Sequence, residues 1–244
     1  MKKIIKWVFK LLPLVIFKFF QTKYYCIRKN KVSDVLLYRR NKKFLEKVCK
    51  AIGIEFIVDG VENLPVEESF LITPNHQSLI DPLIFFNIFN DPISFACKDS
   101  IKKLPIVNDI VYLCDGCYLE RDNLRQEIKV MKYIRDKMET KNLRYIVFPE
   151  GTRTKNPDMS TNEFKPGAFK YTMDIKKKIV PACIYGSNRI FNKKIKDKKY
   201  PIYVSFLKPI SKEDYEQLST KQVSELVKKQ IDKRLEQIKL ISNY

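Results

Sequence analysis

Short apolar runs alternate with longer amphipathic runs from residue 54 to residue 240, and this alternation constrains the fold more than any other feature of the sequence. The apolar runs have the length of buried strands, and residues such as Gly60, Pro74 and Pro149 follow them. The longer runs repeat apolar side chains at helical spacing. The pattern predicts an α/β fold: a single domain with a mixed, largely parallel sheet flanked by helices.

The expected elements follow from the same pattern. Strands are expected at residues 54–58, 70–73, 93–97, 117–119, 145–148, 179–184 and 202–206. Helices are expected at about residues 32–51, 82–89, 106–113, 122–138 and 220–240, with Asp122 as the N-cap of the fourth. We divide the chain into residues 1–51, a pair of N-terminal amphipathic, membrane-associated helices, and residues 52–244, the α/β domain.

The chain is strongly basic, with 47 Lys and Arg against 28 Asp and Glu and a net charge of +19. Such a surplus favours an anionic partner, which could be a membrane surface, a phosphorylated substrate or nucleic acid. A general preference for lysine in the source genome would explain it as well. Because the sequence has no stacking motif and no recognised nucleic-acid-binding module, no nucleic acid is expected among the partners.

Residues 1–20 are rich in apolar side chains, but Lys6, Lys10, Pro13 and Lys18 interrupt them. The longest uncharged run is far below the ~20 residues of a spanning helix. We expect an interfacial amphipathic helix with Trp7 near the lipid headgroups, which Pro13 kinks or breaks. The alternative is a pair of helices that only cap the core.

Six cysteines include Cys114 and Cys117, which form a C-x-x-C pattern. A structural zinc site needs about four ligands, and the sequence offers no second pair to complete one. We therefore expect buried thiols in a reducing compartment and no metal. The sequence also lacks a G-x-G-x-x-G motif, a Walker loop and a G-x-S-x-G elbow, which removes the usual support for nucleotide binding and serine hydrolysis.

The stretch Asn75-His76-Gln77-Ser78-Leu79-Ile80-Asp81-Pro82 contains the only histidine of the chain. Histidine can take up and return a proton near neutral pH, so His76 is the candidate base. Pro82 suits the first turn of a helix, which makes Asp81 the expected N-cap and leaves His76 in the preceding loop. The loop can fold the imidazole onto the Asp81 carboxylate as a catalytic dyad. The alternative is a turn with one buried histidine and an ordinary helix cap.

A second polar cluster, Phe148-Pro149-Glu150-Gly151-Thr152-Arg153-Thr154, follows the strand expected at residues 145–148. Open α/β sheets bind ligands at the carboxyl ends of their strands. Arg153 has a planar fork that suits a phosphate, Gly151 permits close approach of the backbone, and Thr152 offers a hydroxyl. Lys165, shortly downstream, can add a second cation. The alternative is a turn with a salt bridge between Glu150 and Arg153.

Taken together, the N-H-x4-D and F-P-E-G-T-R patterns, some seventy residues apart, resemble the glycerolipid acyltransferase family. Within it the chain is most similar to bacterial 1-acyl-glycerol-3-phosphate (lysophosphatidic acid) acyltransferases. The block from Gly116 to Arg121, the Lys165-x-Gly167 pair and the strand at Val180-Pro181 fit the same family. Leu119 and Glu120 depart from the Ile-Asp often found there. The resemblance covers about residues 50 to 210.

The resemblance implies transfer of an acyl chain from a thioester, on coenzyme A or acyl carrier protein, to the sn-2 hydroxyl of lysophosphatidic acid, without another cofactor. His76 would be the base and Asp81 its orienting partner. Arg153, Arg121 and Lys165 would bind the phosphate. Glu150 would orient Arg153 or bind a glycerol oxygen. Backbone N–H groups near Glu150 and Gly151 are candidates for the oxyanion site.

The family also implies work at the cytoplasmic face of the cell membrane, on an anionic lipid surface. Three alternatives stay open at the level of sequence. The acceptor could be glycerol 3-phosphate, another lysophospholipid or an aminoacyl lipid, because the motifs do not distinguish these hydroxyl compounds. The chain could also be a non-catalytic membrane-binding relative. Binding of nucleic acid has only the net charge in its favour.

Overall fold

The strands assemble into one seven-stranded sheet in a computed structural model that describes residues 2–120, 123–192, 195 and 198–242, without the side chains of residues 2–6, 8 and 10. The strand order is β1-β7-β6-β2-β5-β3-β4. β6, β2, β5, β3 and β4 are parallel neighbours, whereas β7 runs antiparallel to β6 and β1 pairs parallel with β7. The mixed, largely parallel sheet predicted from the sequence is therefore confirmed. The strands are β1 Ile54–Asp59, β2 Leu71–Pro74, β3 Ile93–Lys98, β4 Cys117–Leu119, β5 Arg144–Ile146, β6 Ile179–Tyr185 and β7 Tyr200–Phe206.

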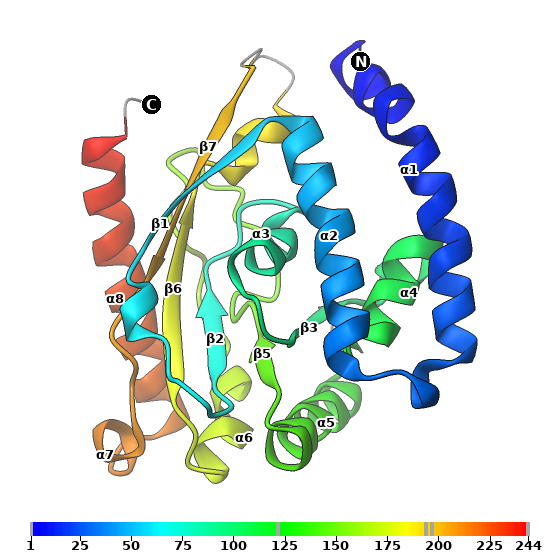
Figure 1. Cartoon of the computed structure of the whole chain (residues 1–244). Coiled ribbons are helices and arrows are strands. Elements are labelled where there is room, and N and C mark those ends of the chain that lie inside the picture. Colours follow the sequence, from blue (N-terminus) through cyan, green and yellow to red (C-terminus); the bar gives the residue numbers. More distant parts are fainter. Residues whose placement is uncertain (1, 121–122, 193–194, 196–197, 243–244) are drawn as a thin grey trace.

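Helices cover both faces of this sheet, and all the helices expected from the pattern are present (Figure 1). Two short helices, α6 and α7, were not predicted. Asn123, not Asp122, caps α5 through its side-chain oxygen, and Asp122 lies outside the described residues. The helices are α1 Lys2–Ile27, α2 Asp34–Ile52, α3 Asp81–Ile88, α4 Pro105–Leu113, α5 Leu124–Lys141, α6 Gly167–Asp174, α7 Lys212–Tyr215 and α8 Thr220–Ile241. Short 3-10 turns lie at Lys29–Lys31, Val61–Asn63, Asp99–Lys103 and Ser187–Phe191.

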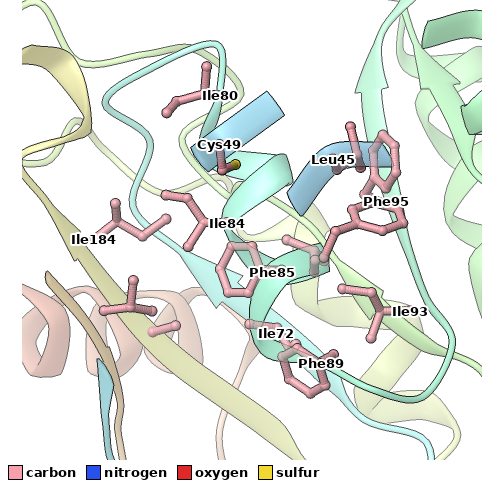
Figure 2. Packing of buried hydrophobic residues seen from close by; sticks show 14 of the residues in the cluster. Leu45, Cys49, Ile72, Ile80, Ile84, Phe85, Phe89, Ile93, Phe95 and Ile184 are labelled. Atoms are coloured by element: carbon pink, nitrogen blue, oxygen red, sulfur yellow. The ribbon is translucent and has the colours of Figure 1, made fainter. Parts of the chain in front are cut away.

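Alternation along the central strands divides the core between the two faces. In β2, Ile72 faces one hydrophobic cluster and Leu71 the other, as side chains in a strand must. The first cluster packs α2 and α3 against the sheet (Figure 2). The second packs α5, α6 and α8 against the opposite face. Five buried side chains form the α8 stripe: Val223, Val227, Ile231, Leu235 and Ile238.

The N-terminal helix pair is joined to this core and is not a separate unit. In α2, Tyr38, Leu45 and Cys49 are buried in the first cluster. α2 begins at the N-cap Ser33 and ends at Gly53, whose φ of 88° is the left-handed conformation in which helices commonly end. The boundary drawn after residue 51 therefore separates two stretches of sequence that share one core.

α1 is attached to the same body mainly through buried polar contacts. The Lys18 ammonium donates to the side-chain oxygen of Asn41 at 2.7 Å, and the Thr22 hydroxyl donates to the Asp109 carboxylate at 2.8 Å. Beyond the end of α1, the Lys29 ammonium lies 2.6 Å from the carboxylate of Asp115. Because buried polar groups are costly unless they are hydrogen-bonded, these pairs fix one face of α1 toward the domain.

α1 continues through Pro13 as one helix, so the break that was considered there does not occur. Proline removes only the hydrogen bond to the carbonyl of Phe9, whose residue is 72% exposed, and water can serve that carbonyl. Within the described part of the chain, no helix has the length and apolar character needed to cross a bilayer.

The C-x-x-C pair is buried, as the sequence suggested. Burial raises the pKa of the Cys114 thiol to about 12 and also raises the pKa of Cys117. Both thiols therefore stay protonated at neutral pH. Among the described residues, no three His, Cys, Asp or Glu side chains cluster as metal ligands do.

The buried Lys18 should make folding stability depend on pH. Burial lowers the pKa of Lys18 to about 8, below its ordinary 10.5, so the unfolded chain binds more protons than the folded one between these pH values. Stability contributed at this site must then rise as pH increases from 8 to 10.5. We expect the unfolding free energy of the wild type, relative to Lys18→Met, to increase by about 1–3 kcal/mol over this range in urea titrations.

The matched control is Lys47→Met, which replaces an exposed lysine on α2. The difference in unfolding free energy between this variant and the wild type should be the same at pH 8 and pH 10.5. If the difference in unfolding free energy between the wild type and Lys18→Met did not change with pH, the lowering of the Lys18 pKa by burial would be contradicted.

Candidate active site

The loop from Asn75 to Ile80 carries His76 and lies between β2 and α3, at the carboxyl end of the central strands. Two side-chain amides anchor it to the end of β6. The Asn75 amide donates to the carbonyl of Ile184 at 2.9 Å and accepts from the Ile184 N–H at 2.7 Å. The Gln77 side-chain oxygen accepts the N–H of Gly186 at 3.1 Å. A segment without regular secondary structure is thereby held in place.

His76 and Asp81 form the predicted pair. His76 Nδ1 lies 2.8 Å from Asp81 Oδ2, and the Asp81 side chain is completely buried. A carboxylate only accepts hydrogen bonds, so Nδ1 carries a proton, and in the neutral imidazole Nε2 is the nitrogen that can accept one. The imidazole packs on the Phe148 ring with centroids 4.2 Å apart, and its side chain keeps 18% exposure.

Asp81 is not the N-cap of α3, as the sequence had suggested. Ile80 occupies the cap position, and Asp81 is already within the helix, next to Pro82 in its first turn. The carboxylate turns back toward the loop, where Oδ2 accepts the N–H groups of Gln77 at 2.7 Å and Ser78 at 2.8 Å as well as His76. The physical reason is that three donors precede the aspartate, and they satisfy its buried charge better than one helix N–H would.

Glu150 supports His76 and forms no ion pair with Arg153 among the described residues. Its carboxylate is buried, with Oε1 accepting the backbone N–H of His76 at 2.7 Å and Oε2 accepting that of Asn162 at 2.8 Å. Burial raises the pKa of this carboxyl, although the two N–H donors act in the opposite direction. The salt bridge between Glu150 and Arg153, considered as an alternative, is absent from the described contacts. The expected orientation of Arg153 by Glu150 is therefore wrong, whereas a contact of Glu150 with the substrate stays a prediction.

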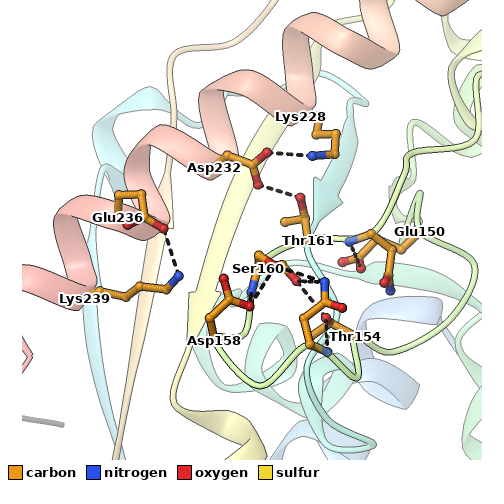
Figure 3. Close-up of polar contacts among 11 residues, drawn as sticks. Glu150, Thr154, Asp158, Ser160, Thr161, Lys228, Asp232, Glu236 and Lys239 are labelled. Atoms are coloured by element: carbon orange, nitrogen blue, oxygen red, sulfur yellow. Dashed lines mark hydrogen bonds and ion pairs between the residues drawn. The ribbon is translucent and has the colours of Figure 1, made fainter.

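The segment after Glu150 holds His76 from the other side. The Thr154 N–H donates to the His76 carbonyl at 2.8 Å, and the Thr154 hydroxyl donates to the Ser160 carbonyl at 2.7 Å. Figure 3 shows this segment beside α8, where the Thr161 hydroxyl donates to Asp232 at 2.5 Å. Both backbone polar groups of His76 are thus fixed by residues 150–161.

Gly151 makes the turn that begins this segment. Its φ is +65°, a conformation that favours glycine, and its N–H donates to the Phe148 carbonyl at 3.1 Å. That N–H is therefore engaged in the turn and is not available as the oxyanion donor considered from the sequence.

Two of the three cations expected at a phosphate site, Arg153 and Lys165, belong to or contact the segment at this turn. Arg153 is exposed and has no ion pair among the described residues, while Thr152 is half-buried. Lys165 has its side chain against Gly151 and its ammonium 3.2 Å from Glu127 of α5. Arg121 lies outside the described residues.

Lys98 was missed by the sequence reasoning, although the signal was available. It is exposed at the carboxyl end of β3, which pairs parallel with β5. Its end therefore lies on the same sheet edge as Phe148 and Arg153. The rule that polar residues after a buried strand mark a ligand site applies to Lys98 as it did to Arg153. Asn75, Gln77 and Asn162 carried no signal that could distinguish them from ordinary loop residues.

The assembled site can deprotonate a hydroxyl group on an anionic molecule. His76 offers a fixed, unprotonated Nε2, and Asp81 can stabilise the imidazolium that forms when it takes a proton. Arg153 and Lys165 supply positive charge near the base, where a substrate phosphate can be held.

Comparisons with known proteins identify the family and the fold of the chain. Residues 55–185 match the sequence model of the family described as Acyltransferase. The chain is 30% identical to the 1-acyl-sn-glycerol-3-phosphate acyltransferase of Borreliella burgdorferi, over 77% of this chain and 74% of that protein. It is 26% identical to the Saccharomyces cerevisiae protein of the same name, over 78% of this chain and 62% of that one.

A solved structure has the same fold over nearly its whole length. The crystal structure of the 1-acyl-sn-glycerophosphate (LPA) acyltransferase PlsC from Thermotoga maritima superimposes with a TM-score of 0.76 at 19% sequence identity. The match covers 98% of each chain.

Without the Asp81 carboxylate, the neutral imidazole of His76 should no longer be held in one tautomer. In the wild type, Nδ1–H is held by Asp81, whereas a free neutral imidazole exchanges between its two tautomers. Because His76 is the only histidine, its ring nitrogens give unambiguous 15N NMR signals. We expect Asp81→Ala to move both ring-nitrogen shifts toward their tautomer-averaged values. The control, Asp136→Ala on the exposed face of α5, should leave them unchanged, and identical spectra for all three proteins would disprove the pairing.

Proposed function

The chain belongs to the acyltransferase family, and on that premise we propose that it transfers an acyl chain from a thioester to the sn-2 hydroxyl of 1-acyl-glycerol-3-phosphate. The product would be phosphatidic acid. The observation that carries the proposal is the His76–Asp81 pair, 2.8 Å apart, on the same sheet edge as the exposed Arg153. The names of the two sequence relatives support the choice of acceptor.

The chemistry requires a base because an alcohol is a poor nucleophile. His76 Nε2 takes the hydroxyl proton as the oxygen attacks the thioester carbonyl, and Asp81 stabilises the resulting imidazolium. The carbon–sulfur bond then breaks, and the imidazolium returns the proton to the leaving thiolate. The acyl group moves directly to the acceptor, so no residue of this chain becomes acylated. The thioester can be carried by coenzyme A or by acyl carrier protein.

The acceptor's phosphate would bind the cations around Gly151. Arg153 can form a bidentate contact, and Lys165 reaches the same turn from the other side. Lys98, at the end of the neighbouring parallel strand, extends the positive surface along the sheet edge. Arg121, which lies outside the described residues, is assigned to this group on the family resemblance.

Membrane attachment through α1 fits a lipid acceptor. The face of α1 opposite its buried polar residues is apolar and exposed. Phe20 and the buried Lys18 are two residues apart, about 200° around the helix. α1 would therefore lie in the plane of an anionic bilayer surface, at the cytoplasmic side of the cell membrane, with this face in the lipid. The exposed residues of the face are Phe9, Leu12, Ile16, Phe17, Phe20, Tyr24 and Ile27.

Replacement of the base and of the phosphate ligand should change different kinetic constants. His76→Ala should lower kcat by about 10²–10⁴-fold, because base catalysis typically contributes that much. Arg153→Ala should mainly raise KM for 1-acyl-glycerol-3-phosphate, because the guanidinium binds the phosphate in ground and transition states alike. Steady-state assays with a panel of acceptors measure both. If His76→Ala kept more than about a tenth of the wild-type rate, the role of His76 as the base would be wrong. If the wild type preferred an acceptor without a phosphate, the assigned substrate would be wrong.

Charge placed on the apolar face of α1 should detach the protein from membranes. We expect the double replacement Phe17→Glu with Phe20→Glu to abolish sedimentation with vesicles that contain anionic lipid. The matched control, Val66→Glu with Leu240→Glu, adds the same charge at two exposed apolar positions elsewhere and should still sediment. Equal sedimentation of the two variants would show that the attachment surface is not on α1.

A further inference from the structure

Four cations form a stripe along the exposed face of α2. Arg39, Lys43, Lys47 and Lys50 follow one another at intervals of three or four residues, so they lie within about 80° of one another around the helix. All four are exposed, and none forms an ion pair or a hydrogen bond with another described residue. At ~1.5 Å per residue, the stripe extends for about 17 Å along the helix.

Neither the lysine content of the chain nor the helix dipole explains this stripe. The two carboxylates of α2 are engaged elsewhere, Asp34 with Lys141 of α5 and Glu46 with Lys42. On α8, by contrast, lysines alternate with carboxylates and pair with them along the helix. Only Lys50 lies in the last turn of α2, where a cation interacts favourably with the helix dipole, so the dipole does not account for the other three.

The stripe and the apolar face of α1 point in opposite directions. Lys18 of α1 and Asn41 of α2 face each other, with the ammonium 2.7 Å from the amide oxygen. Phe20 follows Lys18 by two residues and Lys43 follows Asn41 by two residues, which is about 200° around each helix. Each of these side chains therefore points away from the other helix. A bilayer that meets the apolar face of α1 leaves the stripe on α2 to another partner.

One end of the stripe borders a hollow in the surface, and the other end leads to the edge of the sheet that carries the active site. The hollow has a volume of about 610 Å³, and its cationic lining residues are Arg39, Arg40, Lys42 and Lys43. At the other end, α2 passes into β1 at Gly53, whose carbonyl accepts the N–H of Tyr200 at 2.7 Å. Because β7 begins at Tyr200 and runs antiparallel to β6, this junction lies at the edge where β6 ends and where the loop of His76 is anchored.

We propose that this face of α2 is the docking surface for an acidic carrier protein that brings the acyl thioester. A protruding acidic element of the carrier occupies the hollow, and its carboxylates pair with the stripe. The flexible arm of the carrier then extends toward the active-site edge. Donor and acceptor thus approach His76 from different sides, since the lipid acceptor arrives from the side of α1. The inference rests on the proposed function, because it assumes that the chain transfers an acyl group from a thioester.

The test presents one acyl chain on either of two donors, acyl carrier protein or coenzyme A, with short-chain, monomeric 1-acyl-glycerol-3-phosphate as acceptor. The variant Lys43→Glu with Lys47→Glu reverses the two central charges of the stripe. We expect KM for the acylated carrier protein to rise about five- to twentyfold, because two exposed ion pairs are replaced by repulsion. KM for acyl-coenzyme A and kcat with that donor should not change, which also shows that the variant is folded.

The matched control is Lys229→Glu with Lys233→Glu, two exposed lysines one turn apart on α8, the helix that packs on the opposite face of the sheet. It changes the net charge equally and should leave KM for both donors as in the wild type. Added salt should raise KM for the carrier protein more in the wild type than in the α2 variant, because the charges that salt screens have been reversed there. Sedimentation with anionic vesicles should be the same for the wild type and the α2 variant.

The outcomes separate this inference from the proposed function. A wild type that acylates 1-acyl-glycerol-3-phosphate from neither donor overturns the proposed function. A wild type that uses only acyl-coenzyme A, or an α2 variant whose KM for the carrier protein is unchanged, overturns the docking surface alone. An equal rise of KM for both donors, an equal rise in the α8 variant or a loss of vesicle binding by the α2 variant also overturns it. In these cases the stripe would bind coenzyme A, act through net charge or contact the membrane.

Discussion

Three consecutive backbone N–H groups, those of His76, Gln77 and Ser78, all donate to buried carboxylates, and the site depends on this arrangement. Glu150 takes the first, and Asp81 takes the other two together with the imidazole. A buried carboxylate and an unpaired loop amide are each costly alone, and here the loop N–H groups pair with Glu150 Oε1 and Asp81 Oδ2, although Asp81 Oδ1 has no hydrogen-bond partner among the described residues. The loop therefore needs no secondary structure to be rigid. Its fixed geometry leaves one imidazole nitrogen unprotonated beside a positively charged surface.

The sheet register brings these groups together. Ile72 of β2 is paired with Ile146 of β5, and His76 and Glu150 each follow their strand residue by four positions. The parallel pairing, continued beyond the strand ends, places the N–H of one residue opposite the carboxylate of the other. A slip of one residue would move Glu150 away from His76 and turn the core side chains of β5 to the wrong face. Packing of the core and positioning of the base are thus set by the same pairing.

The sequence predicted what depends on local pattern and missed what depends on register. Strands, long helices and the His76–Asp81 pair were found because periodicity and motif spacing are visible along the chain. The contact of Glu150 with the backbone N–H of His76 was not predicted, because that group is 74 residues away and has no side-chain signature. Asp81 was predicted to be the N-cap of α3 but is the first residue inside the helix. An aspartate before a proline can be either a helix cap or a carboxylate directed back to the loop, and the sequence does not distinguish the two. α6 was missed because eight residues give too little period to recognise. Lys98 was overlooked although the strand-end rule covered it.

The contacts of α1 can form only one after another as the chain is synthesised. Lys18 and Thr22 are synthesised before their partners, because Asn41 follows Lys18 by 23 residues and Asp109 follows Thr22 by 87. Until residue 109 has emerged, the nascent helix can form, but its polar face cannot dock. During that interval the exposed apolar face is free to find a lipid surface. If α1 binds a membrane as proposed above, the rest of the domain would fold at the surface to which α1 is already attached.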